Sequence, residues 1–297
     1  MSFYYFIFLL SISASALIGF SFFGTRARNG KRPLYEKKST YHHIAVYEED
    51  FIRTLRLGKG FDAGKQSGMD IRYPDHLILE YTRLVFAGLL INDSPERILI
   101  IGLGGGVIPR AFNRHFPEAE IDVVELDSQV LKVAERYFQF ETGKKIRVFI
   151  SDGRVFVEKK ISANPPVKYD MIVLDAFDSN SIPGHLLTKE FLEMIQRIME
   201  PKGVIVANVL SDSMLFHSII RTYRKVFGRC YVFLGEQARN AILVTPGTGA
   251  PGLLQKELME KAYRLNKNFD FNFSMFQVAR QIRWGFGRRK LSKILKD

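Results

Sequence analysis

Short apolar runs and amphipathic segments alternate along most of the chain. The runs are four to seven residues long, and the segments between them carry apolar residues three or four positions apart. From residue 97 onward, this pattern predicts strands at 98–101, 121–125, 146–150, 170–174 and 203–209. It predicts helices at 107–115, 128–137, 153–160, 188–199 and 212–226. Such alternation indicates an α/β fold, a mainly parallel sheet with helices on both faces. Two last strands, near 230–235 and 240–245, are expected to pair antiparallel.

The chain before residue 97 has a different pattern. Residues 3–23 are apolar and uncharged, and as a helix they would be long enough to cross a hydrocarbon core of about 30 Å. We expect one transmembrane anchor here, with a cleaved signal peptide and a buried core helix as alternatives. A polar linker at 24–33 follows, and short strands at 41–47 and 52–57 predict a small β domain over 34–70. A helix over 73–92 would open a catalytic domain at 71–250.

The net charge of +12 is concentrated outside the central region. Basic residues follow the apolar run, which would place the catalytic domain in the cytoplasm as part of a single-pass membrane protein. The C-terminal extension, 251–297, begins with a charged helix at 251–267 and ends in a basic segment. Its Trp284 and basic residues could contact the membrane surface, or the helix could pack on the sheet. No nucleic-acid-binding signature is present.

Candidate metal chemistry is weak. The single cysteine, Cys230, excludes an internal disulfide framework and a Cys-based zinc cluster. The six histidines show no ligand spacing. We therefore expect no metal.

The first strand of the α/β region runs into a glycine-rich turn. Its sequence, G-x-G-x-G, contains Gly102, Gly104 and Gly106, with Gly105 between the last two. The dinucleotide fingerprint would need glycine where this chain has Val107. The turn therefore fits the nucleoside half of S-adenosylmethionine or a relative better than a pyrophosphate cofactor. A tight turn without a ligand is the alternative.

Acidic residues follow the next strands at the edge where ligands bind in such sheets. Glu125 and Asp127 end the second strand, Asp152 and Gly153 follow the third, and Asp175 follows the fourth. We expect Glu125 to bind a ribose, Asp152 an adenine amino group, and Asp175 to face the reacting atoms. Each acid could instead be a helix cap.

Asp175 is followed three residues later by Asp178. Paired carboxylates beside a sulfonium suit amine chemistry, because an aliphatic amine is protonated at neutral pH and must lose a proton before it attacks. One acid would accept the proton and the other would anchor an ammonium.

In its order of elements, the chain resembles the spermidine synthase (polyamine aminopropyltransferase) family over about residues 35–245, particularly its membrane-associated or transporter-fused branch. The resemblance is carried by YHHIAVYE, ILIIGLGGG, VVELD, SDGRVF and YDMIVLDAFD. It implies a small β domain followed by a methyltransferase-type Rossmann-like domain. It also implies that Gln66 and Tyr81 flank the donor, that Asp175 is the base and that Asp178 anchors the amine.

The chain departs from the family pattern at two places. The family commonly has an aspartate in the glycine loop where this chain has Gly105, and YHEM where this chain has YTRL with Arg83. The leading hypothesis is aminopropyl transfer from decarboxylated S-adenosylmethionine to an amine such as putrescine. A methyltransferase that uses S-adenosylmethionine is the alternative, and a non-catalytic ligand-binding or membrane scaffold is the third. A homodimer is considered as the assembly.

Overall fold

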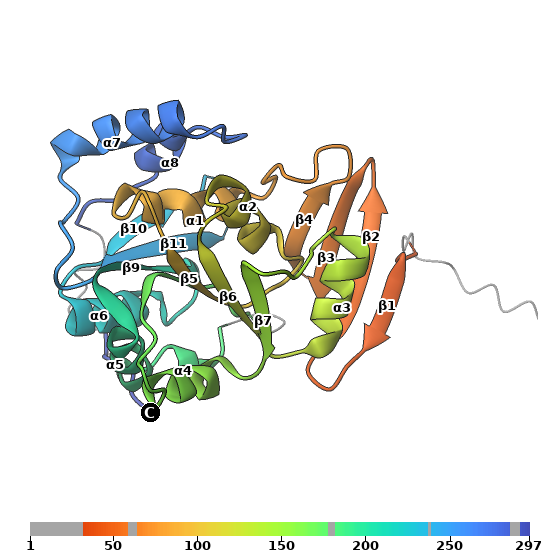
Figure 1. Ribbon diagram of the computed structural model, residues 1–297, viewed down its shortest axis with the longest axis horizontal. Helices are drawn as coiled ribbons and strands as arrows, with labels where there is room; N and C mark the ends of the chain where they lie inside the picture. The colour runs from red at the N-terminus through yellow and green to blue at the C-terminus, as the bar shows by residue number, and fades with distance from the viewer. Residues whose placement is uncertain (1–31, 59–63, 178–181, 237–238, 286–291) are drawn as a thin grey trace, which may run out of the picture. The chain divides into compact units, whose positions relative to one another are not determined.

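The computed structural model describes residues 32–58, 64–177, 182–236, 239–285 and 292–297. Residues 31–297 form one compact unit with two sheets (Figure 1). The first sheet is antiparallel, with the order β1-β2-β3-β4. Its strands are β1 (Tyr35–Lys38), β2 (His43–Glu49), β3 (Ile52–Leu57) and β4 (Lys65–Asp70).

The second sheet has seven strands in the order β10-β11-β9-β8-β5-β6-β7. Five are parallel: β5 (Arg97–Ile101), β6 (Glu120–Glu125), β7 (Ile146–Ile150), β8 (Tyr169–Leu174) and β9 (Met199–Leu210). The chain steps outward from β5 through β6 to β7 and then returns to β8 on the other side of β5. Beyond β9, β11 (Asn240–Pro246) is antiparallel to both β9 and β10 (Tyr231–Leu234). The expected parallel sheet with an antiparallel final pair is confirmed.

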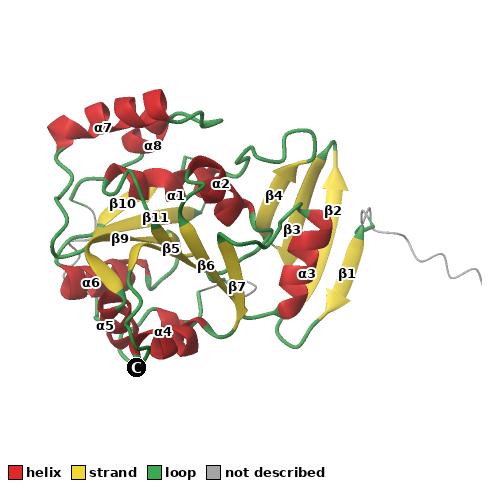
Figure 2. Cartoon of the chain, viewed as in Figure 1, coloured by secondary structure: helices red, strands yellow, loops and turns green. Residues whose placement is uncertain are grey.

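Helices cover both faces of the large sheet (Figure 2). Alternate side chains of each strand point to opposite faces, so Ile98 and Ile100 of β5 belong to one core and Leu99 and Ile101 to the other. The first core is covered by α1 (Glu80–Val85), η1 (Phe86–Leu90), α2 (Val107–His115), α7 (Gln255–Asn268) and α8 (Met275–Arg280). The second is covered by α4 (Gly153–Ile161), α5 (Lys189–Arg197) and α6 (Phe216–Phe227).

Helix α3 (Ser128–Tyr137) joins the two sheets. Val130 and Val133 pack against apolar residues of the small sheet, including Ile44, Leu55 and Met69. The apolar face of the small sheet is therefore covered by α3, the helix that connects β6 to β7 in the large sheet. This contact brings β4 beside the carboxyl end of β5.

The expected helix over 73–92 is shorter than the pattern predicts. Tyr73 forms an isolated β-bridge with Asp70, and Leu79 is extended at the helix N-cap (φ −83°, ψ 136°). The helical part is α1 followed by the 3₁₀ turn η1. Pro74 and the bridge keep the preceding residues out of helical geometry.

The transmembrane helix expected over 3–23 is not supported by the structure. In the part of the chain that the structure describes, no helix is long and apolar enough to cross a membrane. The longest helix described, α7, has 14 residues. Residues 3–23 themselves lie outside the described ranges. The length and hydropathy of an apolar run do not by themselves identify a transmembrane helix, because signal peptides also contain apolar runs. The expectations of a transmembrane helix and of a single-pass membrane protein are therefore withdrawn.

The C-terminal residues 292–297 pack on the helices below the sheet. The Leu295 backbone N–H donates to Thr222 Oγ1 at 3.0 Å, and its carbonyl accepts from the Lys189 N–H at 2.8 Å. Arg154 and Asp297 form an ion pair, with Nη1 and Oδ1 2.7 Å apart. The described end of the basic segment, for which membrane contact and packing were both considered, thus has contacts within its own unit.

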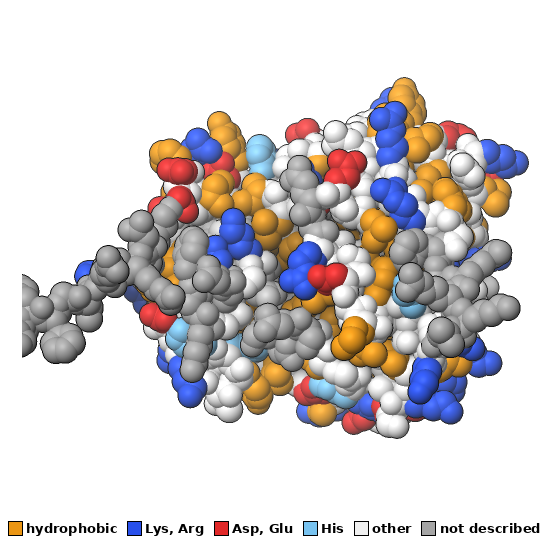
Figure 3. All heavy atoms as spheres, turned by 180° about the vertical axis from the view of Figure 1, so that it is seen from behind, with side chains coloured by type: hydrophobic (Ala, Val, Ile, Leu, Met, Phe, Trp, Pro, Cys, Tyr) orange, Lys and Arg blue, Asp and Glu red, His pale blue; other side chains and the backbone are white. Residues whose placement is uncertain are grey.

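Basic side chains are distributed among acidic and apolar ones on the face shown in Figure 3. Several basic side chains of the described residues form ion pairs, among them Arg53–Glu48, Arg72–Asp70, Arg147–Glu120 and Arg239–Asp212. Exposed pairs of this kind contribute about 0–1 kcal/mol each. They reduce the local effect of the net positive charge without determining the fold.

The end of β5 passes very close to the end of β8. A Cβ on Gly102, whose φ is +104°, would lie 2.3 Å from the carbonyl oxygen of Asp175. We expect Gly102→Ala to destabilise the protein by about 2–4 kcal/mol and to lower Tm by roughly 5 °C or more, because backbone atoms cannot yield as a side chain can.

Gly143→Ala is the matched control, since a Cβ there meets nothing within 4 Å. Thermal unfolding of both variants measures the difference. Equal Tm values for the two would contradict the close approach.

Candidate active site

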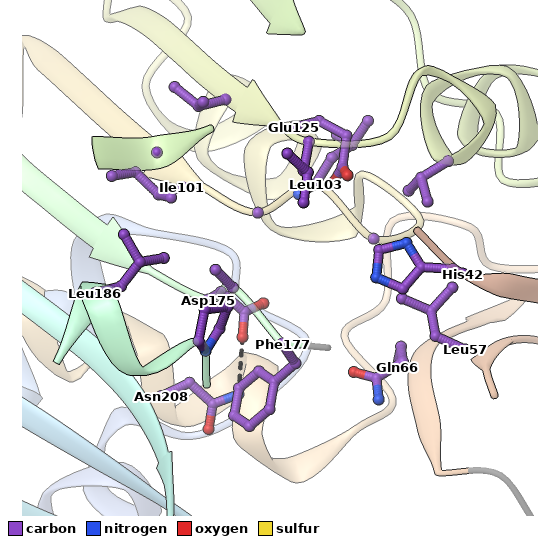
Figure 4. Close-up of a pocket in the computed structure, with 18 of the residues that line it drawn as sticks. His42, Leu57, Gln66, Ile101, Leu103, Glu125, Asp175, Phe177, Leu186 and Asn208 are labelled. Carbon is purple, nitrogen blue, oxygen red and sulfur yellow. Dashed lines mark hydrogen bonds between the residues drawn. The ribbon is translucent and has the colours of Figure 1, made fainter. Parts of the chain in front are cut away.

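A cavity of about 440 Å³ opens at the carboxyl ends of the parallel strands (Figure 4). Its wall comes from both sheets: β4 supplies one side, and the ends of β5, β6, β8 and β9 supply the other. This is the edge where the strand order reverses around β5 and where ligands bind in open α/β sheets. The small sheet thus completes a site that the large sheet alone would leave open.

The four glycines of the loop take different places. Gly102 and Gly104 line the cavity. Gly105 packs behind it, where an added Cβ would meet Ser67 Oγ at 2.7 Å and the Phe138 ring at 2.9 Å. Gly106 is the left-handed N-cap residue of α2, with φ 72°. The loop therefore lets the backbone approach a ligand, and the position of the family's acid is closed by packing.

Glu125 lies in the cavity wall at the end of β6. Its Oε2 accepts from the Leu103 N–H at 3.0 Å and its Oε1 from the Asp127 N–H at 2.9 Å. Burial raises the pKa of Glu125, although both backbone hydrogen bonds oppose the shift. A carboxylate oxygen can accept more than one hydrogen bond, so the group can still accept from a hydroxyl.

Asp127 is not part of the cavity wall. It caps α3 by accepting from the Gln129 N–H at 2.9 Å. Its other oxygen accepts from Ser39 Oγ and lies 3.3 Å from His42 Nδ1. His42 does line the cavity. Asp127 therefore acts on the site through His42, whose ring it orients.

Asp152 is both a helix cap and a cavity residue. Its Oδ1 accepts from the Arg154 and Val155 N–H groups, and its Oδ2 lies 2.8 Å from His185 Nε2. Burial favours a higher pKa for Asp152, but the hydrogen bonds from Val155 and His185 outweigh it and lower the pKa. Gly153 lies beside it in the wall. His185 belongs to the 3₁₀ turn η2 (Gly184–Leu186), which closes this end of the cavity.

Asp175 stands at the end of β8, on the floor of the cavity (Figure 4). Burial raises the pKa of its carboxyl to about 7, and a hydrogen bond from Asn208 opposes that shift. Asn208 Nδ2 donates to Asp175 Oδ1 at 2.8 Å. The carboxyl group can therefore exchange a proton near neutral pH, as a general base must.

Gln66 and Tyr81 reach the cavity from β4 and α1. The Tyr81 hydroxyl donates to the Gln66 carbonyl at 2.7 Å. Burial, and then the nearby Asp175, raises the pKa of Tyr81 well above its ordinary value, so the hydroxyl stays protonated. Asp178, the other expected catalytic acid, lies outside the described residues.

Arg83 lies in a different hollow. It lines a surface pocket with Glu80, Glu236 and Arg280, on the opposite side of α1 from Tyr81. In the described structure it therefore does not replace the acid that is missing at Gly105.

Several cavity residues were not expected from the sequence, among them His42, Phe177 and Asn208. Asn208 interrupts the otherwise apolar strand GVIVANVL near its carboxyl end, and this was a usable signal. His42 and Phe177 had no such signal, because their place depends on the contact between the sheets and on the loop after β8. Among the described residues, no group of three His, Cys, Asp or Glu could hold a metal ion.

Comparison with known proteins identifies related chains. The family model described as spermine/spermidine synthase domain matches residues 80–243. A polyamine aminopropyltransferase from Vibrio vulnificus is 39% identical over 238 residues, which cover 78% of this chain and 77% of that protein.

Solved structures share the fold. Human methyltransferase-like protein 13, in complex with SAH, is 29% identical with a TM-score of 0.60, over 64% of this chain and 92% of that one. Spermidine synthase from Thermotoga maritima is 21% identical with a TM-score of 0.64, over 84% of each chain. The family match and the 39% identity decide the assignment: this chain belongs to the spermine/spermidine synthase family.

Proposed function

We propose that this protein transfers an aminopropyl group from decarboxylated S-adenosylmethionine to a small amine such as putrescine. Aminopropyl transfer is the activity in the name of the Vibrio vulnificus relative. The observation in the site that supports it most is Asp175, a buried carboxyl with a pKa of about 7 on the floor of the cavity. A protonated amine needs such a group, because it must lose a proton before it attacks, and the family match favours the aminopropyl donor over a methyl donor.

The donor nucleoside would lie along the glycine loop. Gly102 and Gly104 allow it to approach the backbone, Glu125 would accept from the ribose hydroxyls, and Asp152 would accept from the adenine amino group. Gln66 and Tyr81 would flank the sulfonium end. Because Gly105 is packed against Ser67 and Phe138, the donor's ammonium would be held by other groups than an acid at that position.

The acceptor amine would lie over Asp175. The amine nitrogen attacks the aminopropyl carbon bonded to sulfur, the C–S bond breaks, and methylthioadenosine leaves with the electron pair on sulfur. Asp175 accepts the proton that the amine must lose. The sulfonium is already an activated electrophile, so the protein mainly aligns the two substrates and excludes water. We propose that Asp178 anchors the distal ammonium.

Methyl transfer is the weaker candidate. It is favoured by the 29% identity with the human methyltransferase-like protein and by the missing acid at Gly105. Arg83 does not favour it, because Arg83 lines a different pocket from the candidate site.

The two functions differ in their products. We expect the full-length protein, incubated with decarboxylated S-adenosylmethionine and putrescine, to release methylthioadenosine in equal amount to the longer polyamine formed. With S-adenosylmethionine and the same amines, it should release no S-adenosylhomocysteine above background. Liquid chromatography with mass spectrometry measures all three products, and the reverse pattern would establish methyl transfer.

Asp175→Asn should reduce kcat by at least about a hundredfold, because the amide cannot accept the amine proton. Donor affinity, measured by calorimetry, should change little. Asp93→Asn, on an exposed loop, is the control and should retain full activity. Full turnover by Asp175→Asn would remove Asp175 from the mechanism.

The pH dependence of kcat/KM should follow the same carboxyl group. The base is active as the carboxylate, and its fraction increases as pH rises through the pKa of about 7. Activity should therefore rise with pH through this range and then level off. Initial rates between about pH 5.5 and 8.5 measure it. A flat profile for the wild-type protein would show that no such group limits the reaction.

A further inference from the structure

Two asparagines from neighbouring antiparallel strands form a chain of hydrogen bonds that ends on Asp175. Asn240 Nδ2 donates to Asn208 Oδ1 at 2.8 Å, and Asn208 Nδ2 donates to Asp175 Oδ1 at 2.8 Å. Figure 4 shows the last of these bonds at the cavity floor. Both amides also line the cavity.

Strand pairing places the two amides together. Asn208 of β9 is opposite Ile242 of β11, and Asn240 is opposite Leu210. Asn208 and Asn240 are therefore diagonal neighbours on one face of the sheet, a distance that side-chain amides can bridge. Only 2% of Asn208 is exposed. Its two polar atoms are each used in this chain, so burial costs no unpaired group.

The direction of the chain is chemically defined at Asp175. A carboxylate only accepts hydrogen bonds, so Asn208 must present its NH₂ group to Asp175. Its carbonyl then points to Asn240, which donates to it. Rotating the Asn208 amide by 180° would set its carbonyl against the carboxylate and its NH₂ against another NH₂. The arrangement with Asn240 in place therefore favours the ionised form of Asp175.

We propose that Asn208 and Asn240 are positioning residues that hold Asp175 by one oxygen and leave the other oxygen to accept the amine proton. The proposal rests on the proposed role of Asp175 as the base. It assigns to β11, which belongs to the antiparallel end of the sheet, a part in catalysis through two hydrogen bonds. Neither asparagine itself needs to contact the reacting atoms.

Other groups face the same space and remain unchanged in the test. The charged and titratable side chains of the described cavity wall besides Asp175 are His42, Lys65, Tyr81, Glu125, Asp152, His185 and Arg239. They come from the residue before β2, from β4, α1 and β6, from the β7–α4 turn, from η2 and from the segment before β11. A shift that follows substitution of an uncharged amide can therefore be assigned to the hydrogen bond.

The test compares pH profiles of kcat/KM. Asn208→Leu removes the donor at nearly constant volume, so the pKa of Asp175 should rise and the acidic limb should move up by about one pH unit or more. Asn240→Ala should move it in the same direction by a smaller amount. The double variant should match Asn208→Leu, because Asn240 acts only through Asn208. Asn268→Ala, exposed at the end of α7, is the control.

If the acidic part of the pH profile does not move in Asn208→Leu, the proposal is wrong. If the pH shift of the double variant equals the sum of the two single shifts, Asn240 does not act through Asn208. If Asn208→Leu does not fold, the pH profile of Asn240→Ala is the test. An unchanged acidic part of that profile would refute the hydrogen-bond chain from Asn240 to Asp175. Carboxyl NMR of ¹³C-labelled protein measures the Asp175 titration without turnover. A shift of that titration with no change in rate would refute the base role while retaining the positioning.

Discussion

The close approach of two strand ends is the constraint on which the site depends. Gly102 at the end of β5 lies so near the Asp175 carbonyl that only a residue without a side chain fits. The same close approach is held by the Asp175 N–H, which donates to the Ile101 carbonyl at 2.8 Å. Because the two strand ends lie side by side, the glycine loop and the Asp175 carboxyl line the same cavity. The loop would hold the nucleoside, and the carboxyl would accept a proton. A displaced β8 would separate donor binding from catalysis.

The cavity is completed by elements that are far from these two strand ends in sequence. The small sheet contributes Gln66, and His42 lies just before its strand β2. This sheet is held in place by the packing of α3 on its apolar face. Asp127 links α3 to the cavity wall, since it caps α3 and also contacts His42. Stability of the α3 contact and the geometry of donor binding are therefore coupled. Burial of Asp175 by the same walls raises its pKa toward neutrality.

Patterns with a single physical cause were predictable from the sequence. Strand and helix periods gave the large sheet and its antiparallel end, and the strand-end position brought Glu125, Asp152 and Asp175 to one cavity. The sequence was less informative where several causes compete. Asp127 had the same signal as Glu125 but caps a helix, and Arg83 lies on the other side of α1. Asn208 contacts Asn240 because β9 pairs with β11, and no local sequence pattern shows that pairing.

The most direct test of this account is a crystal structure with methylthioadenosine and putrescine bound. The account predicts ribose hydroxyls on Glu125 and a putrescine nitrogen within about 3 Å of the Asp175 carboxylate, on the oxygen that Asn208 leaves free. Putrescine bound away from Asp175, or a nucleoside outside the glycine loop, would contradict it.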